Sequence, residues 1–150
     1  MRSFILDTNV VSAFAPGRPG RPAVDPALSD WVRRNEDSLY LSAITPLEIE
    51  IGLLKLGRTS PGRWHTQMID WFDVLLEQFT DRVLPADLSV ARMAAAIADQ
   101  NASRGLDPGL PDIVIAATTL AHGMTLLTRN IRHFVASGVT AIDPFDRLPL

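Results

Sequence analysis

Three acidic side chains stand where a strand or a loop is expected to give way to a helix. Asp7 follows the apolar run 3–6, Glu48 lies in the first turn of an expected helix, and Asp112 opens another. In open parallel sheets the functional crevice lies outside the carboxyl ends of the strands, where the strand-to-helix turns converge. We therefore expect these carboxylates, far apart in the sequence, to meet at one edge of a sheet.

A cluster of carboxylates limits what can bind there. Close carboxylates repel one another and are costly unless a cation or bound protons compensate. The chain has no cysteine and only three histidines, at scattered positions, so the natural occupant is a hard ion bound through oxygen. Mg²⁺ prefers oxygen ligands and needs only one or two direct carboxylates, and Mn²⁺ serves similarly. The pattern predicts a site for Mg²⁺ or Mn²⁺ at Asp7, Glu48 and Asp112.

Each acid also has a local interpretation that involves no ligand. Asp7 can cap the helix that follows it, and Glu48 can be the return partner of Thr45 in a capping box. Asp112 can favour the helix dipole from its position near a helix N-terminus. Asp7 fits such a role least, because a carboxylate at the end of a core strand is costly unless it is used. Glu50 competes with Glu48 but points elsewhere on the helix.

The elements that must position these acids alternate short apolar runs with longer helical repeats. This order is typical of an α/β domain with a central, mainly parallel sheet flanked by helices. We expect strands at 3–6, 39–44, 82–86, 124–128 and 139–142, and helices at 8–14, 27–34, 45–56, 61–79, 88–104 and 111–122. Gly57 is expected to end the third helix, and the inner face of the fifth is expected to hold Leu88, Ala91, Ala94, Ala95 and Ala98. A single domain is expected over 1–150.

Two further segments have alternative interpretations. Segment 15–26 is rich in proline and glycine and carries Arg18 and Arg21, so it is either a solvated connection or a basic lip beside a site. Between Trp64 and Phe79, apolar residues repeat at steps of three and four. Such a stripe is typical of a core or a dimer interface.

Composition excludes several classes of protein. Seventeen acidic and fourteen basic residues give a net charge of −3, which disfavours non-specific binding of nucleic acid but allows a local basic patch. The lack of cysteine excludes thiolate metal centres, redox dithiols and cysteine nucleophiles. No apolar run approaches the roughly 20 residues of a membrane-spanning helix, and we find no secretory signal. We expect a soluble, cytoplasmic protein with no membrane partner.

Three segments resemble the motif blocks of one known family. They are FILDTNVVS at 4–12, AITPLEIEIGLLKLG at 43–57 and LPDIVIAATTLAHGMTLLTRNIRHF at 110–134. In this order they are similar to the PIN domain family, most closely to the VapC-like or FitB-like toxins of bacterial type II toxin–antitoxin pairs. The resemblance implies a compact fold with a parallel sheet and an acidic pocket that binds Mg²⁺ or Mn²⁺ and hydrolyses RNA phosphodiesters. By motif, Asp7, Glu48 and Asp112 correspond to the family's catalytic, metal-binding acids.

One motif position departs from the family pattern. A fourth acidic or polar residue usually falls in the block TRNIRHF, where this chain has Asn130 and His133 and no acid. Asn130 is a candidate catalytic residue, because it can orient water or phosphate together with Thr128 and Arg129. His133 is the other candidate for the place of the missing acid.

The resemblance also implies partners. A cognate antitoxin would cross the active site with its tail and form a hetero-oligomer with the chain, and DNA would be bound only through that antitoxin. The apolar helices around 47–56 and 64–79 offer a groove for a partner helix. A homodimer is expected, and it would bring Arg18, Arg21 or Arg129 toward the RNA substrate.

The sequence allows one other interpretation and argues against another. A PIN fold with an incomplete set of acids would be a catalytically weak or inactive module that binds protein or RNA, and divalent-dependent turnover separates it from a nuclease. Phosphatases of the haloacid dehalogenase type also begin with a strand that ends in Asp. They require a second Asp two residues later, where this chain has Asn9.

Overall fold

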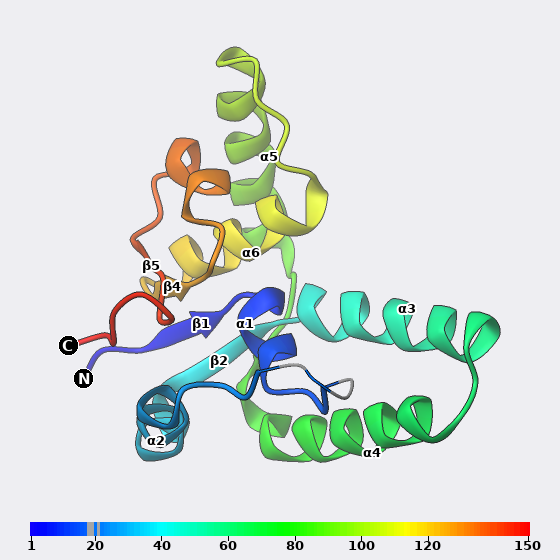
Figure 1. The fold of residues 1–150 in the computed structure, drawn as a ribbon. Helices are drawn as coiled ribbons and strands as arrows, with labels where there is room; N and C mark the ends of the chain where they lie inside the picture. The colour runs from blue at the N-terminus through cyan, green and yellow to red at the C-terminus, as the bar shows by residue number, and fades with distance from the viewer. Residues whose placement is uncertain (18–19, 21) are drawn as a thin grey trace.

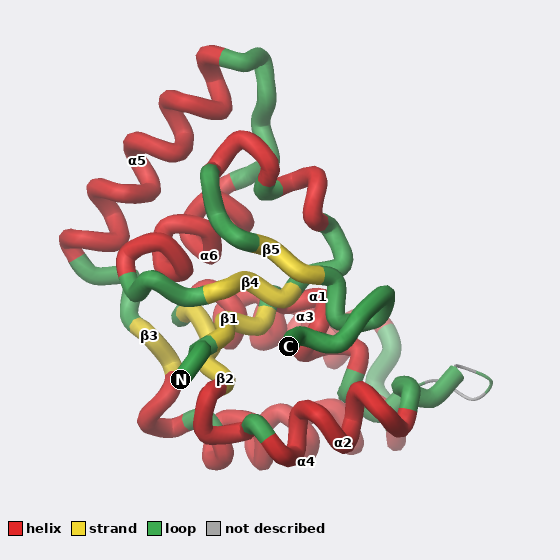
Figure 2. The backbone as a smooth tube through the Cα atoms, turned by 90° about the vertical axis from the view of Figure 1, so that its left-hand side faces the viewer, coloured by secondary structure: helices red, strands yellow, loops and turns green. Residues whose placement is uncertain are grey.

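Five short parallel strands form one sheet at the centre of the molecule (Figure 2). The structure is a computed structural model that describes residues 1–17, 20 and 22–150. The sheet has the order β3-β2-β1-β4-β5, and its strands are β1 (Phe4–Leu6), β2 (Leu39–Ser42), β3 (Val83–Leu84), β4 (Thr125–Leu127) and β5 (Ala141–Ile142). In the central strand, Ile5 pairs with Tyr40 on one side and Leu126 on the other. The predicted α/β class with a mainly parallel sheet is confirmed.

Helices cover both faces of this sheet. They are α1 (Thr8–Ala13), α2 (Pro26–Arg34), α3 (Ile44–Thr59), α4 (Arg63–Gln78), α5 (Leu88–Ser103) and α6 (Leu110–Ala121). Short 3-10 turns lie at Glu36–Ser38, Thr80–Arg82, Ile131–His133 and Val135–Ser137. In Figure 1, α5 and α6 lie on one side of the sheet and α2 and α4 on the other. Helix α3 extends away from the sheet, and α4 packs beside it. The two chain ends meet, since the Arg2 guanidinium donates to the carbonyl of Leu150.

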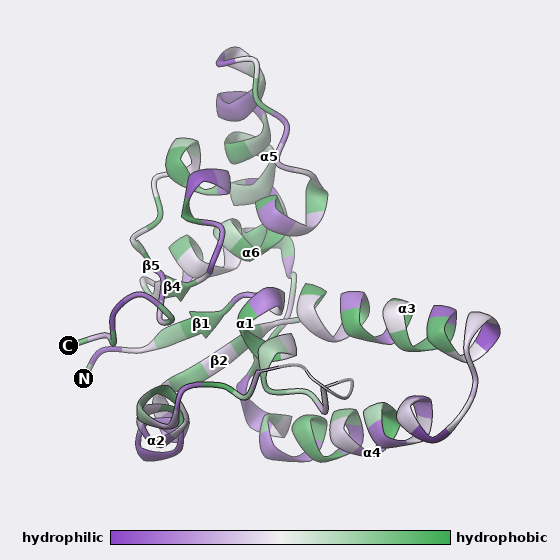
Figure 3. Ribbon diagram, viewed as in Figure 1, coloured by the Kyte–Doolittle hydropathy of each residue, from purple (hydrophilic) through white to green (hydrophobic). Residues whose placement is uncertain are grey.

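Alternate strand residues enter two separate cores. Phe4 and Leu6 pack with α1, α3 and α4, whereas Ile5 between them packs with α5 and α6. Parallel strands buried on both faces need this continuous apolar sequence. Figure 3 shows it as hydrophobic colour along β1 and through α6. Among the helices that the structure describes, none combines the length and the apolar character needed to cross a membrane.

The aromatic stripe of α4 belongs mainly to the core. Phe72 and Phe79 are buried beside the strands, and Met68 and Trp71 pack against them. Trp31 of α2 meets Phe4 edge-on, with ring centroids 5.4 Å apart. The core interpretation of this stripe is therefore confirmed.

The prediction that Gly57 ends the third helix was wrong, because α3 continues to Thr59. A Cβ atom at position 57 would lie 2.9 Å from two atoms of the His65 ring. The glycine therefore serves the close approach of α3 and α4 rather than a left-handed turn. His65 is half-buried in this contact.

The predicted inner face of α5 was also wrong in part. Ala94 is buried as expected, but Leu88 is 75% exposed, and the buried face is formed by Val90, Ala94, Ile97 and Asn101. The helix is rich in alanine, which leaves several stripes of similar apolar character. Larger side chains at positions 90 and 97 fill the space against α6 and select the face.

Candidate active site

The candidate site lies at the carboxyl edge of the sheet, beyond the end of β1. Asp7 follows that strand directly, and its backbone N–H donates to the carbonyl of Leu127 in the neighbouring strand β4. Glu48 comes from the first turns of α3 and Asp112 from the first turn of α6. The chain thus brings together three acids that are far apart in the sequence, as the strand-to-helix junctions predicted.

Asp7 is almost completely buried and accepts two short hydrogen bonds. Its Oδ1 accepts from the backbone N–H of Thr8 at 2.7 Å, which makes Asp7 the N-cap of α1. Its Oδ2 accepts from the hydroxyl of Thr128 at 2.6 Å. The expected capping role is therefore present, and it does not account for the second oxygen or for the burial.

The Thr128 hydroxyl makes three hydrogen bonds. Its proton goes to Asp7, while its oxygen accepts from the backbone N–H of Asn130 at 3.0 Å and from Asn9 Nδ2 at 3.4 Å. A hydroxyl has one proton to donate and two lone pairs to accept. The direction of the bond to Asp7 is therefore fixed by the other two contacts.

The pKa of Asp7 is raised from its ordinary value of 3.8 to about 6. Burial is the main cause, and the negative charges of Asp112 and Glu48 add to it. The hydrogen bonds from Thr128 and from the backbone of Thr8 act in the opposite direction and lower the pKa. The pocket thus stabilises a proton or another cation at Asp7.

Glu48 is positioned by two threonines. The hydroxyl of Thr8 donates to Glu48 Oε1 at 2.7 Å, and it lies 3.0 Å from the hydroxyl of Thr45. Because the single Thr8 proton goes to the carboxylate, Thr45 is the donor in the second bond. Glu48 is half-buried and faces the site, whereas Glu50 is exposed, in agreement with the preference for Glu48.

The capping box expected from Thr45 and Glu48 was wrong. Helix α3 begins at Ile44, its N-cap is Ala43, and no side chain caps it. Thr45 is fully buried and contacts Thr8 instead. Sequence reasoning did not assign a site role to Thr8. The signal available was its place in the first turn of a helix directly after an aspartate that ends a strand.

The segment after β4 closes the other side of the site. Asn130 is exposed and contributes its backbone N–H to Thr128. His133 lies one 3-10 turn further on, and its Nδ1 is 3.0 Å from Oδ2 of Asp112. Between the two candidates for the place of the missing acid, His133 is thus the one whose side chain reaches an acid of the site.

The donor atoms of the site suit a hard divalent ion. In the part of the chain that the structure describes, no three acidic or histidine side chains converge closely enough to form a complete metal cage. A cage is not required, because Mg²⁺ keeps several waters and binds proteins through one or two carboxylates. Asp7 and Asp112 supply such carboxylates, and their mutual repulsion favours a cation between them.

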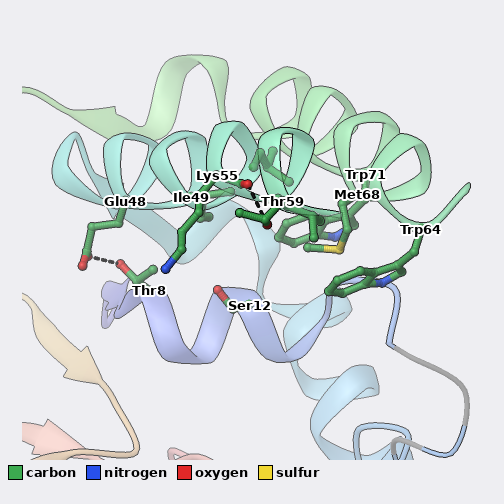
Figure 4. A pocket seen from close by; sticks show the side chains of 12 residues that line it. Thr8, Ser12, Glu48, Ile49, Lys55, Thr59, Trp64, Met68 and Trp71 are labelled. Atoms are coloured by element: carbon green, nitrogen blue, oxygen red, sulfur yellow. Dashed lines mark hydrogen bonds between the residues drawn. The ribbon is translucent and has the colours of Figure 1, made fainter. Parts of the chain in front are cut away.

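An apolar groove lies between α3 and α4 and has Glu48 as its acidic residue. It encloses about 380 Å³ and has Thr8 and Glu48 at one end and Trp64, Met68 and Trp71 at the other (Figure 4). The indole N–H of Trp64 donates to the carbonyl of Pro16 at 2.9 Å. The groove lies where sequence reasoning expected one, between the helices at 47–56 and 64–79.

Arginine side chains were the other expected site contacts. Arg129 directly follows Thr128, is exposed, and places its guanidinium carbon 3.6 Å from the centroid of the Phe145 ring. Arg18 and Arg21 lie outside the described residues. Of these three arginines, Arg129 is therefore the one that lies among the described residues.

The protein is a parallel α/β domain with an acidic pocket, formed by a buried aspartate and two further carboxylates at the carboxyl edge of its sheet. The chain belongs to the PIN domain family, whose sequence pattern matches residues 4–137. The family resemblance inferred from the three motif blocks is thereby confirmed.

Relatives with established names span nearly the whole chain. The VapC ribonuclease Y4jK of Sinorhizobium fredii is 34% identical over 144 residues, which cover 95% of this chain and 97% of the relative. The toxin FitB of Neisseria gonorrhoeae is 33% identical over 147 residues, with 94% and 97% covered.

Solved structures agree with the fold. The crystal structure of FitAcB from Neisseria gonorrhoeae superimposes with a TM-score of 0.78 at 32% identity and covers 95% of this chain and 98% of its own. The structure of FitAB bound to a DNA fragment gives the same TM-score and identity, with 95% of each chain covered.

Proposed function

We propose that this chain is the toxin of a toxin–antitoxin pair and that it is a divalent-metal-dependent endoribonuclease of the cytoplasm. The observation that carries the proposal is the buried Asp7, whose pKa is raised to about 6 by burial and by the charges of Asp112 and Glu48. Relatives named as a ribonuclease and as a toxin support it. The substrate is RNA, and the reaction is hydrolysis of a phosphodiester bond.

Each residue has a part in this reaction. Asp7 and Asp112 would hold Mg²⁺ or Mn²⁺, with Glu48 beside them as a further acid of the site. An ion held there would supply Lewis acidity, lowering the pKa of water and offsetting negative charge on the attacked phosphate. Thr128 and Thr8 fix the orientation of Asp7 and Glu48 through their hydroxyl protons. Asn130 orients water or phosphate at the edge of the pocket.

Arg129 supplies positive charge that the whole chain lacks. The net charge is −3, so RNA must be attracted by a local group rather than by the overall field. Stacking on Phe145 limits the freedom of the Arg129 guanidinium before substrate arrives. A guanidinium presented in this way makes bidentate contacts to phosphate.

The groove between α3 and α4 is the proposed site of the antitoxin. An apolar groove with the Glu48 carboxylate at one end suits an amphipathic helix followed by a basic side chain. The pair FitAB, whose structure contains DNA, supports a hetero-oligomer in which the antitoxin provides the DNA contact. A homodimer of the toxin chain completes the proposed assembly.

A second candidate function is a PIN-fold module with little or no catalytic activity that binds protein or RNA. Two observations favour it: Asn130 occupies the position of a usual acid, and no complete three-ligand group is present in the part of the chain that is described. Turnover of RNA that depends on a divalent ion distinguishes the nuclease from this module.

The proposal is tested by incubating antitoxin-free protein with total RNA, with Mg²⁺, with Mn²⁺ and with chelator. We expect discrete products that disappear with chelator and with Asp7→Asn. Glu50→Gln is a matched control, because it neutralises an exposed acid of the same helix as Glu48. Absence of cleavage by folded parent protein with both ions, on structured RNAs as well, would favour the binding module.

A further inference from the structure

His133 makes a direct contact with one acid of the site, Asp112, and has no part in the proposed reaction. Its Nδ1 lies 3.0 Å from Oδ2 of Asp112, with 44% of the histidine side chain and 23% of the aspartate side chain exposed. A carboxylate can only accept a hydrogen bond, so the ring nitrogen in this contact carries the proton. That nitrogen is therefore not free to bind a metal ion while the contact lasts.

The contact is the last in a series of hydrogen bonds along segment 128–133, which lies between the two aspartates. Thr128 donates to Asp7, and the backbone N–H of Asn130 donates to the Thr128 hydroxyl. The backbone N–H of His133 in turn donates to the carbonyl of Asn130 at 2.9 Å. The imidazole then reaches Asp112. Segment 128–133 thus spans the pocket and contacts both carboxylates.

The turn that carries His133 is fixed to the core. Phe134 follows it directly, is 1% exposed and packs in the core beside α5 and α6. The backbone N–H of Phe134 donates to the carbonyl of Ile131 and closes the 3-10 turn. The backbone that carries the ring is therefore held in place, and the hydrogen bond from the ring restrains the rotamer of Asp112.

We propose that His133 is a positioning residue for Asp112: its Nδ1–H occupies Oδ2, fixes the carboxylate and would leave Oδ1 available to a divalent ion. The inference rests on the proposed metal-dependent function and adds to it a residue that acts through a ligand. In this role the histidine substitutes for the missing fourth acid by orienting an existing carboxylate. Hydrogen-bond partners of this kind restrict metal ligands in many sites.

Two substitutions separate positioning from direct ligation. His133→Ala removes the donor, whereas His133→Asn places an amide N–H close to the position of Nδ1 and retains it. His122→Ala is the matched control, because it removes another exposed imidazole from the opposite end of α6. Thermal melting of each variant in chelator establishes that it is folded.

The measurement is calorimetric titration of the metal-free full chain with Mn²⁺ and with Mg²⁺. We expect His133→Ala to weaken binding by about tenfold or more, which is the usual effect of losing such a partner. His133→Asn is expected to bind close to the parent value, and His122→Ala to match the parent.

The contrary outcomes are distinct. Unchanged ion affinity in His133→Ala would overturn the inference and leave the proposed function intact. Equal losses in the alanine and asparagine variants would identify the imidazole itself as a ligand and would also overturn it. No binding of either ion by the folded parent would refute the metal dependence of the proposed function, and this inference with it.

Discussion

Asp7→Asn removes one buried charge while it keeps the size of the side chain. In the folded chain the pKa of Asp7 is about 6, above its ordinary value of 3.8, so the native state binds the proton more tightly than the unfolded chain. The stability from this proton is fully present below pH 3.8 and is lost as pH rises through 6. A difference of about two pKa units at about 1.4 kcal/mol each corresponds to about 3 kcal/mol.

The amide offsets part of this gain. The Thr8 backbone and the Thr128 hydroxyl donate to different carboxylate oxygens, and asparagine has an oxygen at only one of these two positions, so it keeps only one of the bonds. The lost hydrogen bond costs about 1 kcal/mol at every pH. Near pH 4 the variant is therefore expected to be about 1 kcal/mol less stable than the parent. Near pH 8 it is expected to be about 2 kcal/mol more stable, which raises Tm by roughly 4–8 °C.

Urea unfolding of parent and variant between pH 4 and pH 8, in chelator, measures this difference. Asp99→Asn makes the same chemical change at an exposed carboxylate of α5 and serves as the control for the substitution itself. The expected result is a free-energy difference that changes sign across the range. A difference that stays constant with pH would refute the argument that burial and the neighbouring acids raise the pKa of Asp7.

Three further substitutions test separate contacts of the fold and the site. In Gly52→Ala the added Cβ has no atom within 4 Å, so the variant should stabilise α3 by about 0.5–1 kcal/mol. In Gly57→Ala the added Cβ must displace the His65 ring, so this variant should be less stable than Gly52→Ala. Thermal melts that rank the two variants the other way would contradict the contact between α3 and α4. Thr8→Val leaves Glu48 without its hydroxyl donor and should slow RNA cleavage by about tenfold. Thr8→Ser keeps the hydroxyl and should cleave at the parent rate. A valine variant as fast as the parent would show that Thr8 has no role in the site. Arg129→Ala, made in the inactive Asp112→Asn background, should weaken RNA binding and lower the salt slope by about one; an unchanged slope in a filter-binding assay would show that the guanidinium contacts no phosphate.

The order of elements and the three acids could be predicted from the sequence, because both depend on local patterns. An apolar run ending in Asp7 shows a strand and its carboxyl end together. Parallel topology then brings Glu48 and Asp112 to the same edge. The choice of Glu48 over Glu50 also followed from helix geometry alone, since neighbours two positions apart point in different directions.

The details that sequence reasoning missed depend on contacts between distant segments. Gly57 has the residue type of a helix end, but the reason for it is the His65 ring of another helix. Thr45 matches a capping box by spacing, yet its partner is Thr8, which lies 37 residues earlier. The link from His133 to Asp112 joins a turn and a helix whose separation only the packed core determines.

The central claim is that water activated at the acidic pocket hydrolyses RNA. Its most direct test is cleavage of RNA with Mg²⁺ in water enriched in heavy oxygen, followed by mass spectrometry of the product ends, for the parent and for Asp112→Asn. The account predicts heavy oxygen in the terminal phosphate of the parent's products, and no products from Asp112→Asn or in chelator. Unlabelled cyclic phosphate ends, or cleavage that continues without Asp112 or without the ion, would contradict it.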